Sequence, residues 1–162
     1  MFARVLVRII VARRRGAVVA TTRESTQAGE LNMLNKGAGD FPDQIYEFHA
    51  TYGRPLKALR FVAHNLERFP DRAGKELTQL TQLTLASNRL TALPDSICDL
   101  AKLSALNLLR NQLTALPDRL GDLSHLRHLD IATNRLQTLP LTFGNLTRLE
   151  RVVADCNDLR RI

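Results

Sequence analysis

The chain has 162 residues, of which 44% are apolar and 24% charged, and its 23 Lys and Arg against 16 Asp and Glu give a formal net charge of +7. This composition excludes a chain disordered throughout, and no apolar run approaches the ~20 residues of a bilayer-spanning helix, which excludes a polytopic membrane protein. The two cysteines, Cys98 and Cys156, are too few for a disulfide framework and favour a reducing compartment.

The first predicted element is a basic leader over residues 1–23, which hold six arginines and no acidic residue. Residues 24–162 hold the remaining 17 basic and 16 acidic residues, so most of the net charge lies in the leader. At ~3.6 residues per turn, the apolar side chains and the arginines of its first half fall on opposite faces. We therefore expect a basic amphipathic leader or capping helix before a separate domain at 24–162.

Three roles are open for this leader. The arginine-rich, acid-free pattern is typical of organellar transit peptides, and it also suits a helix lying on an anionic membrane or an acidic partner. The third role, which we favour, is an end cap or a poorly ordered tail. A secretory signal is excluded because Arg8 and the arginines at 13–15 interrupt the apolar run, and myristoylation is excluded because position 2 is Phe2.

A covering helix is expected next, over residues 17–28, followed by two irregular repeat units. These units span 30–48 and 56–79 and are separated by a short insertion, and the second carries His64 where later units carry asparagine. Six of the eight Phe and Tyr side chains lie in or between these units. We expect them to fill a wider N-terminal part of the core.

Three regular units of 23 residues follow, beginning at Leu80, Leu103 and Leu126, and a fourth that begins at Leu149 stops part-way. Their shared pattern is LxxLxLxxNxLxxLPxxIxxLxx. Proline occupies one position in five successive units, which makes the register of the repeat secure. These prolines are Pro42, Pro70, Pro94, Pro117 and Pro140.

Each unit predicts one short strand, because its alternating leucines point to one side and are buried together. One unit cannot bury its apolar face alone, so the six strands are expected to stack in parallel into a solenoid about 25 Å long. The asparagine after each strand is expected to bond backbone groups of neighbouring turns, a structural role and not ligand binding. These asparagines are Asn88, Asn111, Asn134 and Asn157.

The last unit reaches Ile162 at the leucine position before the proline, with no polar cap. We expect the chain to be a fragment of a longer array. The alternative is that its last strand meets a partner or a second copy.

The regular units resemble the leucine-rich repeat family, in the LPxxIxxL subclass of intracellular Ras-group proteins. The motifs that carry the resemblance are LTLASNRLTALPDSICDL, LNLLRNQLTALPDRLGDL and LDIATNRLQTLPLTFGNL, and it covers 24–162. It implies an α/β leucine-rich repeat solenoid, with short parallel strands on the concave face, irregular or helical convex segments and an N-terminal capping helix. It also implies a non-enzymatic scaffold without cofactors that binds a protein partner on the concave face.

The side chains between the leucines are expected to face the concave side and to align in columns across the strands. Apolar centres with a polar rim suit a protein interface, and the alternative is a sheet face that is only solvated. The residues expected to bind a partner are Arg60, Val62, Thr84, Asn107, Leu109, Arg110, His128 and Asp130.

Other sites are not supported by the sequence. His125 and His128 lack further ligands at metal-binding spacing, and Cys156 lies inside a repeat, which argues against a catalytic thiol. The nearly neutral repeat region makes nucleic acid an unexpected partner. We expect a cytoplasmic signalling protein, or an organellar one if the leader directs import. The alternative function is the recognition portion of a larger repeat-containing enzyme or receptor.

Overall fold

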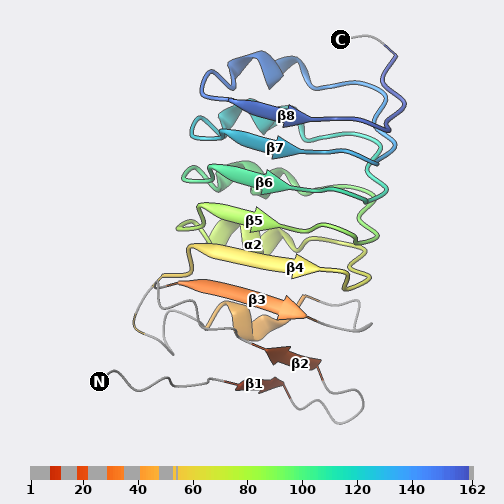
Figure 1. Ribbon diagram of the computed structural model, residues 1–162. Coiled ribbons are helices and arrows are strands. Elements are labelled where there is room, and N and C mark those ends of the chain that lie inside the picture. The colour runs from red at the N-terminus through yellow and green to blue at the C-terminus, as the bar shows by residue number, and fades with distance from the viewer. Residues whose placement is uncertain are drawn as a thin grey trace.

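The computed structural model describes residues 8–11, 18–21, 29–34, 41–47, 53 and 55–160. Six parallel strands form one open sheet in chain order, each paired in register with the next (Figure 1). The predicted solenoid is therefore confirmed. The strands are β3 (Glu30–Leu34), β4 (Ala58–Val62), β5 (Gln82–Thr84), β6 (Ala105–Asn107), β7 (His128–Asp130) and β8 (Arg151–Val153).

Short helices cover the other side of the sheet, one after each repeat proline. Proline suits this position because its fixed φ directs the chain out of the preceding extended segment and its missing N–H is not needed at a helix start. The prolines before the last four helices have φ between −55° and −72°. The helices are η1 (Asp43–Ile45), α2 (Asp71–Glu76), η2 (Asp95–Asp99), η3 (Asp118–Asp122) and η4 (Leu141–Asn145).

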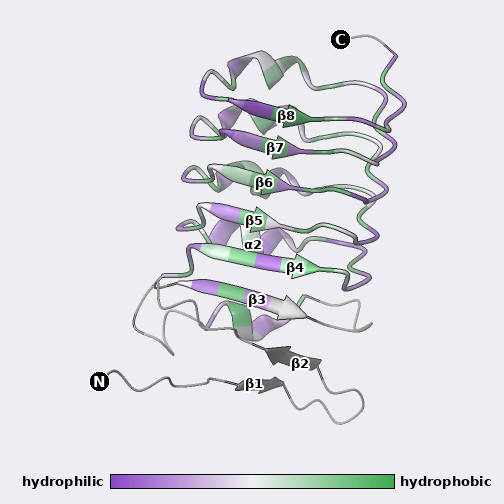
Figure 2. Cartoon of the chain, in the orientation of Figure 1, coloured by the Kyte–Doolittle hydropathy of each residue, from purple (hydrophilic) through white to green (hydrophobic). Residues whose placement is uncertain are grey.

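The core is a stack of leucines between the sheet and these helices. Leu59, Leu83, Leu106 and Leu129 occupy one register position and are at most 2% exposed. Burying each such side chain contributes roughly 1.5–3 kcal/mol. Apart from the buried Ala58, the neighbouring strand positions are polar or half-buried, so that hydrophilic and hydrophobic segments alternate along the strands (Figure 2). This alternation gives the sheet one apolar and one accessible face.

The asparagine that follows each regular strand forms hydrogen bonds with the backbone of two neighbouring turns, and together these asparagines form a ladder. The Asn88 Oδ1 accepts hydrogen bonds from the backbone N–H groups of His64 and Leu66, at 3.0 and 3.1 Å, and its Nδ2 donates to the carbonyls of Phe61 and Leu85, at 2.8 and 2.9 Å. One side chain therefore joins two successive repeats. Three of these four bonds, all but the one from the His64 N–H, recur at each of Asn111, Asn134 and Asn157.

Aromatic side chains fill the core beneath the two irregular units, as expected. The ring of Phe41 lies 5.5 Å from the rings of both Phe61 and Phe69, centroid to centroid. The buried His64, which replaces the ladder asparagine, stacks on Phe61 at 3.7 Å. An imidazole with an aromatic neighbour therefore takes the place of the amide where the repeat is irregular. Phe48 and Tyr52 lie outside the described residues.

The predicted helix of the leader is wrong where the structure describes it. β1 (Arg8–Val11) and β2 (Val18–Thr21) pair antiparallel, and β2 lies against β3 at the end of the solenoid (Figure 1). The segments RIIV and VVAT are rich in β-branched residues, which favour extended backbone and lose χ1 freedom in a helix. The capping helix expected over 17–28 is likewise a strand at Val18–Thr21. The other leader residues, and the predicted domain boundary at residue 23, lie outside the residues that the structure describes.

Candidate functional site

The strand register aligns the concave side chains in the predicted columns. One column runs Asn32, Arg60, Thr84, Asn107, Asp130 and Val153, and the neighbouring one runs Glu30, Ala58, Gln82, Ala105, His128 and Arg151. Both columns lie on the face opposite the buried leucines, because side chains alternate along a strand. The concave face is thus a grid whose composition can be read from the sequence.

A shallow hollow of about 340 Å³ lies on this face across β5 to β8. It brings together four of the eight residues expected to bind a partner, namely Thr84, Asn107, His128 and Asp130. Apart from the buried Leu83, Leu106 and Leu129, the lining residues that sequence reasoning did not select belong to the same two columns, so the register alone would have identified them. They are Gln82, Ala105, Arg151 and Val153.

Two of the polar residues in the hollow also stabilise the turn that follows their strand. Asn107 Oδ1 accepts a hydrogen bond from the backbone N–H of Leu109 at 3.0 Å, and Asp130 Oδ1 accepts one from Ala132 at 3.1 Å. This bond to the residue two positions further on is the usual asparagine or aspartate turn. Substitutions at Thr84 and His128 therefore test binding without breaking a turn hydrogen bond of this kind.

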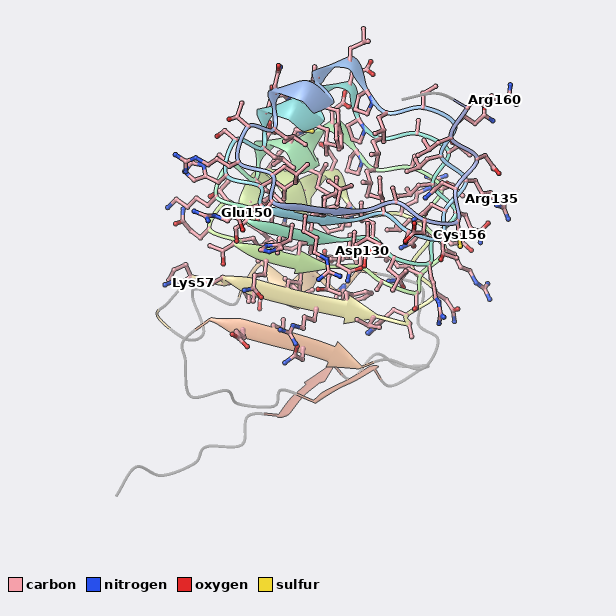
Figure 3. The ribbon with its side chains drawn as sticks, turned by 45° about the horizontal axis from the view of Figure 1, so that its top comes forward. Lys57, Asp130, Arg135, Glu150, Cys156 and Arg160 are labelled. Atoms are coloured by element: carbon pink, nitrogen blue, oxygen red, sulfur yellow. The ribbon has the colours of Figure 1, made fainter. Side chains whose placement is uncertain are left out.

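The charges at the start of the strands form an exposed group. Arg127 Nη1 lies 2.6 Å from Glu150 Oε1, and His128 Nε2 lies 3.9 Å from Glu150 Oε2. All three side chains are about half exposed, so these contacts add little stability. Figure 3 shows Glu150 and Lys57 at the start of the sheet and Asp130 near the strand ends. Among the residues that line the hollow itself, Asp130 is acidic and Arg151 is basic, so it offers charge of both signs.

The remaining four predicted residues lie outside the hollow. Arg60 and Val62 are on β4, one strand before it, and Leu109 and Arg110 lie in the turn after β6. Arg110 has φ of 54°, in the left-handed region, so the chain has already left the strand direction there. The equivalent Cys156 lies beyond the end of the sheet in Figure 3. The predicted surface thus divides into a sheet part and a turn part.

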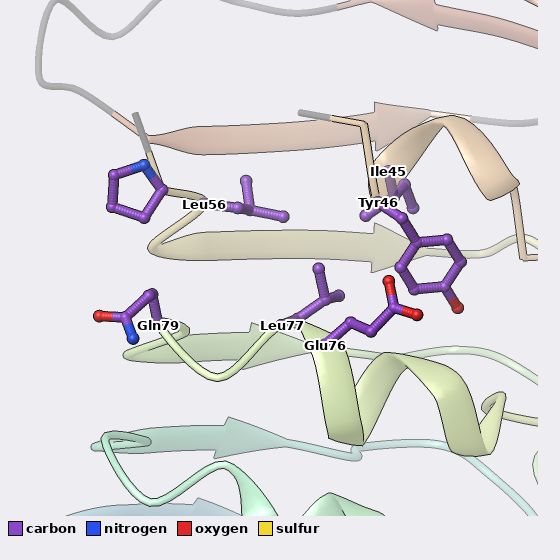
Figure 4. A pocket seen from close by; sticks show the side chains of 7 residues that line it. Ile45, Tyr46, Leu56, Glu76, Leu77 and Gln79 are labelled. Atoms are coloured by element: carbon purple, nitrogen blue, oxygen red, sulfur yellow. The ribbon is translucent and has the colours of Figure 1, made fainter. Parts of the chain in front are cut away.

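A second hollow, of about 250 Å³, lies between the irregular units (Figure 4). Its lining includes Tyr46 and Glu76, and the Arg72 guanidinium stands 4.1 Å from the centre of the Tyr46 ring. Burial raises the pKa of the Tyr46 phenol to about 12, so this group stays neutral near pH 7. Arg72 also bonds Glu76 at 2.6 Å. The arrangement is a packed cation–π cluster without a nucleophile.

Neither cysteine has the surroundings of a catalytic thiol. Burial raises the pKa of Cys98 to about 11, which keeps it protonated, and Cys156 is exposed on a turn. Within the described ranges, no three His, Cys, Asp or Glu side chains are grouped so that they could hold a metal ion. In the same part of the chain, no helix is long and apolar enough to cross a bilayer.

Stacked parallel strands, an asparagine ladder and proline-initiated convex helices define a leucine-rich repeat solenoid. Leucine-rich repeat profiles match residues 54–113 and 125–146. The chain therefore belongs to the leucine-rich repeat family. No curated protein sequence matches it significantly.

Solved structures share the fold. A leucine-rich repeat protein of Leptospira interrogans is 27% identical with a TM-score of 0.74, over 83% of this chain and 33% of the other. The leucine-rich repeat domain of the type III effector XopL is 27% identical with a TM-score of 0.69, over 82% and 46%. The plant peptide hormone receptor RGFR1, in complex with RGF2, is 25% identical with a TM-score of 0.63, over 91% and 21%. The chain thus spans less than half of each of these structures.

Proposed function

We propose that this protein is a non-enzymatic scaffold of intracellular signalling that binds a protein partner in the concave hollow over β5 to β8. The observation that carries the proposal is the hollow itself, in which half-buried and exposed polar residues of four strands lie beside the half-buried Ala105 and Val153. Such a surface can exclude water at its centre and form hydrogen bonds at its rim. Leucine-rich repeat domains generally mediate protein–protein interaction, and RGFR1 is solved with RGF2 bound.

The test compares a concave and a convex variant of the full chain in affinity capture. In the concave variant, Thr84→Arg fills part of the hollow and His128→Glu places an acidic side chain in it, and neither change removes a ladder bond. The control carries Asp95→Lys and Asp118→Lys, two exposed positions on the convex helices η2 and η3. We expect partners retained by the control to be lost from the concave variant by tenfold or more. An unchanged set of partners in both variants would contradict the proposal.

A second measurement places the contact directly. A photo-crosslinking amino acid at Ala105, inside the hollow, should capture the partner, whereas the same group at Asp95 on the convex side should not. Crosslinks from Asp95 alone would assign binding to the other face.

A second candidate function is supported by the short span of the chain relative to its structural matches. On this proposal, the repeats are the recognition portion of a larger enzyme or receptor that continues beyond Ile162. Sequencing the transcript past Ile162 tests it, and a stop codon directly after that residue would oppose it.

Finer assignments rest on sequence resemblance. We propose membership of the LPxxIxxL subclass, and the layout of the first units is similar to that of leucine-rich repeat-containing protein 57. We also propose cytoplasmic residence, with organellar import or membrane attachment through residues 1–23 as the alternative. A fluorescent fusion of the full chain tests both: diffuse cytosolic signal supports the first, and an organellar or membrane signal supports the second.

A further inference from the structure

The repeat region is nearly neutral as a whole, but its charges are divided between two surfaces. Residues 80–148, which form the three regular units, hold five acidic residues, and four of them are exposed on the convex helices η2 and η3. The fifth, Asp130, is half-buried on β7 and accepts a hydrogen bond from the Ala132 N–H. The turns that follow the three strands, at 85–93, 108–116 and 131–139, therefore hold no acidic residue.

Each of these turns carries one exposed arginine. Arg89 follows β5, Arg110 follows β6 and Arg135 follows β7, and we call the three residues the basic ridge. Among the residues that the structure describes, none offers these side chains an ion pair, whereas Arg119 on η3 lies 3.2 and 2.9 Å from two aspartates. A guanidinium without an intramolecular partner can bind a carboxylate through two parallel hydrogen bonds. The basic ridge is therefore available to an anionic ligand.

The repeat holds the three arginines close together. Arg89 and Arg135 occupy equivalent positions two units apart, each directly after a ladder asparagine, so two strand spacings, or roughly 10 Å, separate them along the stack. The Arg110 N–H donates to a carbonyl of the turn after β7 at 3.0 Å, which fixes this residue between the other two. Figure 3 shows Arg135 at the side of the sheet where the strands end, opposite Lys57 and Glu150.

The basic ridge is short, because the turns on either side carry both signs of charge. Glu67 and Arg68 are exposed after β4, and Asp155, Asp158 and Arg160 are exposed after β8. The three turns of the ridge also contain no aromatic residue. Surfaces that bind nucleic acid without sequence preference combine a basic groove with aromatic rings on which bases stack. The ridge therefore suits a short acidic segment of a protein better than nucleic acid.

The basic ridge continues from the concave hollow. Thr84, Asn107 and Asp130 end β5, β6 and β7 and line the hollow, and the arginines follow three to five residues later in the chain. A polypeptide that leaves the hollow in the direction of the strands therefore meets the ridge.

We propose that the basic ridge binds an acidic segment of the protein partner that occupies the concave hollow. The identity of the partner rests on the proposed function, and the ridge adds the chemistry of the partner's flank, namely Asp or Glu carboxylates along one face. An extended segment advances about 3.3 Å per residue, so about five residues span the ridge. Because exposed ion pairs are screened by salt, this binding is sensitive to ionic strength.

Fluorescence anisotropy with a labelled peptide tests the ridge on the full chain. The probe is a peptide of about eight residues in which Glu and Ser alternate, so that the carboxylates share one face, and the comparison peptide has Gln at each Glu position. We expect the acidic peptide to bind at least tenfold more tightly than the Gln peptide at about 50 mM salt, and to lose this preference at about 300 mM.

A triple variant removes the ridge. Arg89→Gln and Arg135→Gln install the residue found at Gln112, and Arg110→Ser installs the residue found at Ser87, which are the equivalent positions of neighbouring units. The thermal midpoint should therefore stay close to that of the wild type. We expect the acidic peptide to bind this variant tenfold or more weakly.

The matched control neutralises three exposed basic residues away from the ridge, by Lys75→Gln, Lys102→Gln and Arg148→Gln. It loses the same net charge and should bind the acidic peptide as tightly as the wild type. Equal binding to the wild type and the ridge variant would overturn the proposal, and an equal loss in the control would trace binding to net charge alone.

Nucleic acid is the alternative occupant that the same assay excludes or reveals. Tighter binding of single-stranded DNA of matched charge than of the acidic peptide would overturn the proposal. The peptide reports on the ridge, whereas affinity capture with the Thr84 and His128 substitutions reports on the hollow. The inference and the proposed function can therefore fail separately.

Discussion

Replacing Asn111 by alanine should destabilise the protein by about 3 kcal/mol. The buried Asn111 side chain accepts from the Leu90 N–H at 3.1 Å and donates to the carbonyls of Leu85 and Leu108, at 3.0 and 2.9 Å. Alanine leaves the Leu90 N–H without this acceptor and takes one of two amide donors from the Leu85 carbonyl, both in the preceding repeat. A buried polar group left unsatisfied costs about 1–3 kcal/mol, and water cannot reach a site this closed.

Urea unfolding followed by circular dichroism measures this loss, and the thermal midpoint should fall by roughly 6–12 °C at about 2–4 °C per kcal/mol. The control is Asn145→Ala, at an exposed residue that ends η4, which should change stability by less than about 0.5 kcal/mol. Asn157→Ala, where the same bonds are only half-buried, should cost less than Asn111→Ala. A loss below about 1 kcal/mol for Asn111→Ala would refute the ladder as a source of stability.

Three further predictions concern single side chains. Gly121→Ala should destabilise by about 2 kcal/mol or more in urea unfolding, because its Cβ would lie 2.2 Å from a carbonyl of the next repeat, whereas Gly144→Ala should be neutral or slightly stabilising. Leu106→Ala should cost about 2–5 kcal/mol by the same assay, since it leaves a cavity in the leucine stack. Iodoacetamide should modify Cys156 in the folded protein but Cys98 only after unfolding. Because burial raises the pKa of Cys98 from 9.0 to about 11, the free energy of unfolding should decrease as pH rises from about 9 towards 11. Equal labelling of both thiols at pH 7 would contradict the last prediction.

The regular part of the fold could be predicted because one physical constraint recurs at a fixed spacing. Alternating leucines determine which face of each strand is buried. The asparagine position determines where the chain turns after the strand, and the proline position determines where the convex helix begins. The sequence pattern alone therefore predicts one structural role for Asn88 and its equivalents.

The site and the leader were harder to predict, for local reasons. Whether four strands form a hollow depends on the curvature of the sheet and on the volumes of side chains such as Ala105. The order of residues in the sequence does not determine that curvature. Arg110 continues a polar column in sequence, but its left-handed backbone removes it from the sheet. In the leader, arginine spacing favoured a helix while the β-branched segments at Val18–Thr21 favoured a strand, and the latter prevailed.

The asparagine ladder also determines how unfolding can spread along the chain. Each amide joins only adjacent repeats, as Asn88 joins the repeats of β4 and β5, so cooperativity passes from neighbour to neighbour along one dimension. A defect in the middle, such as Asn111→Ala, then acts as a break between two segments that melt separately, whereas the same defect near β8 shortens a single cooperative block. Amide hydrogen exchange along the strands would distinguish the two, with protection interrupted at β5–β6 in the first case and lost only at β8 in the second.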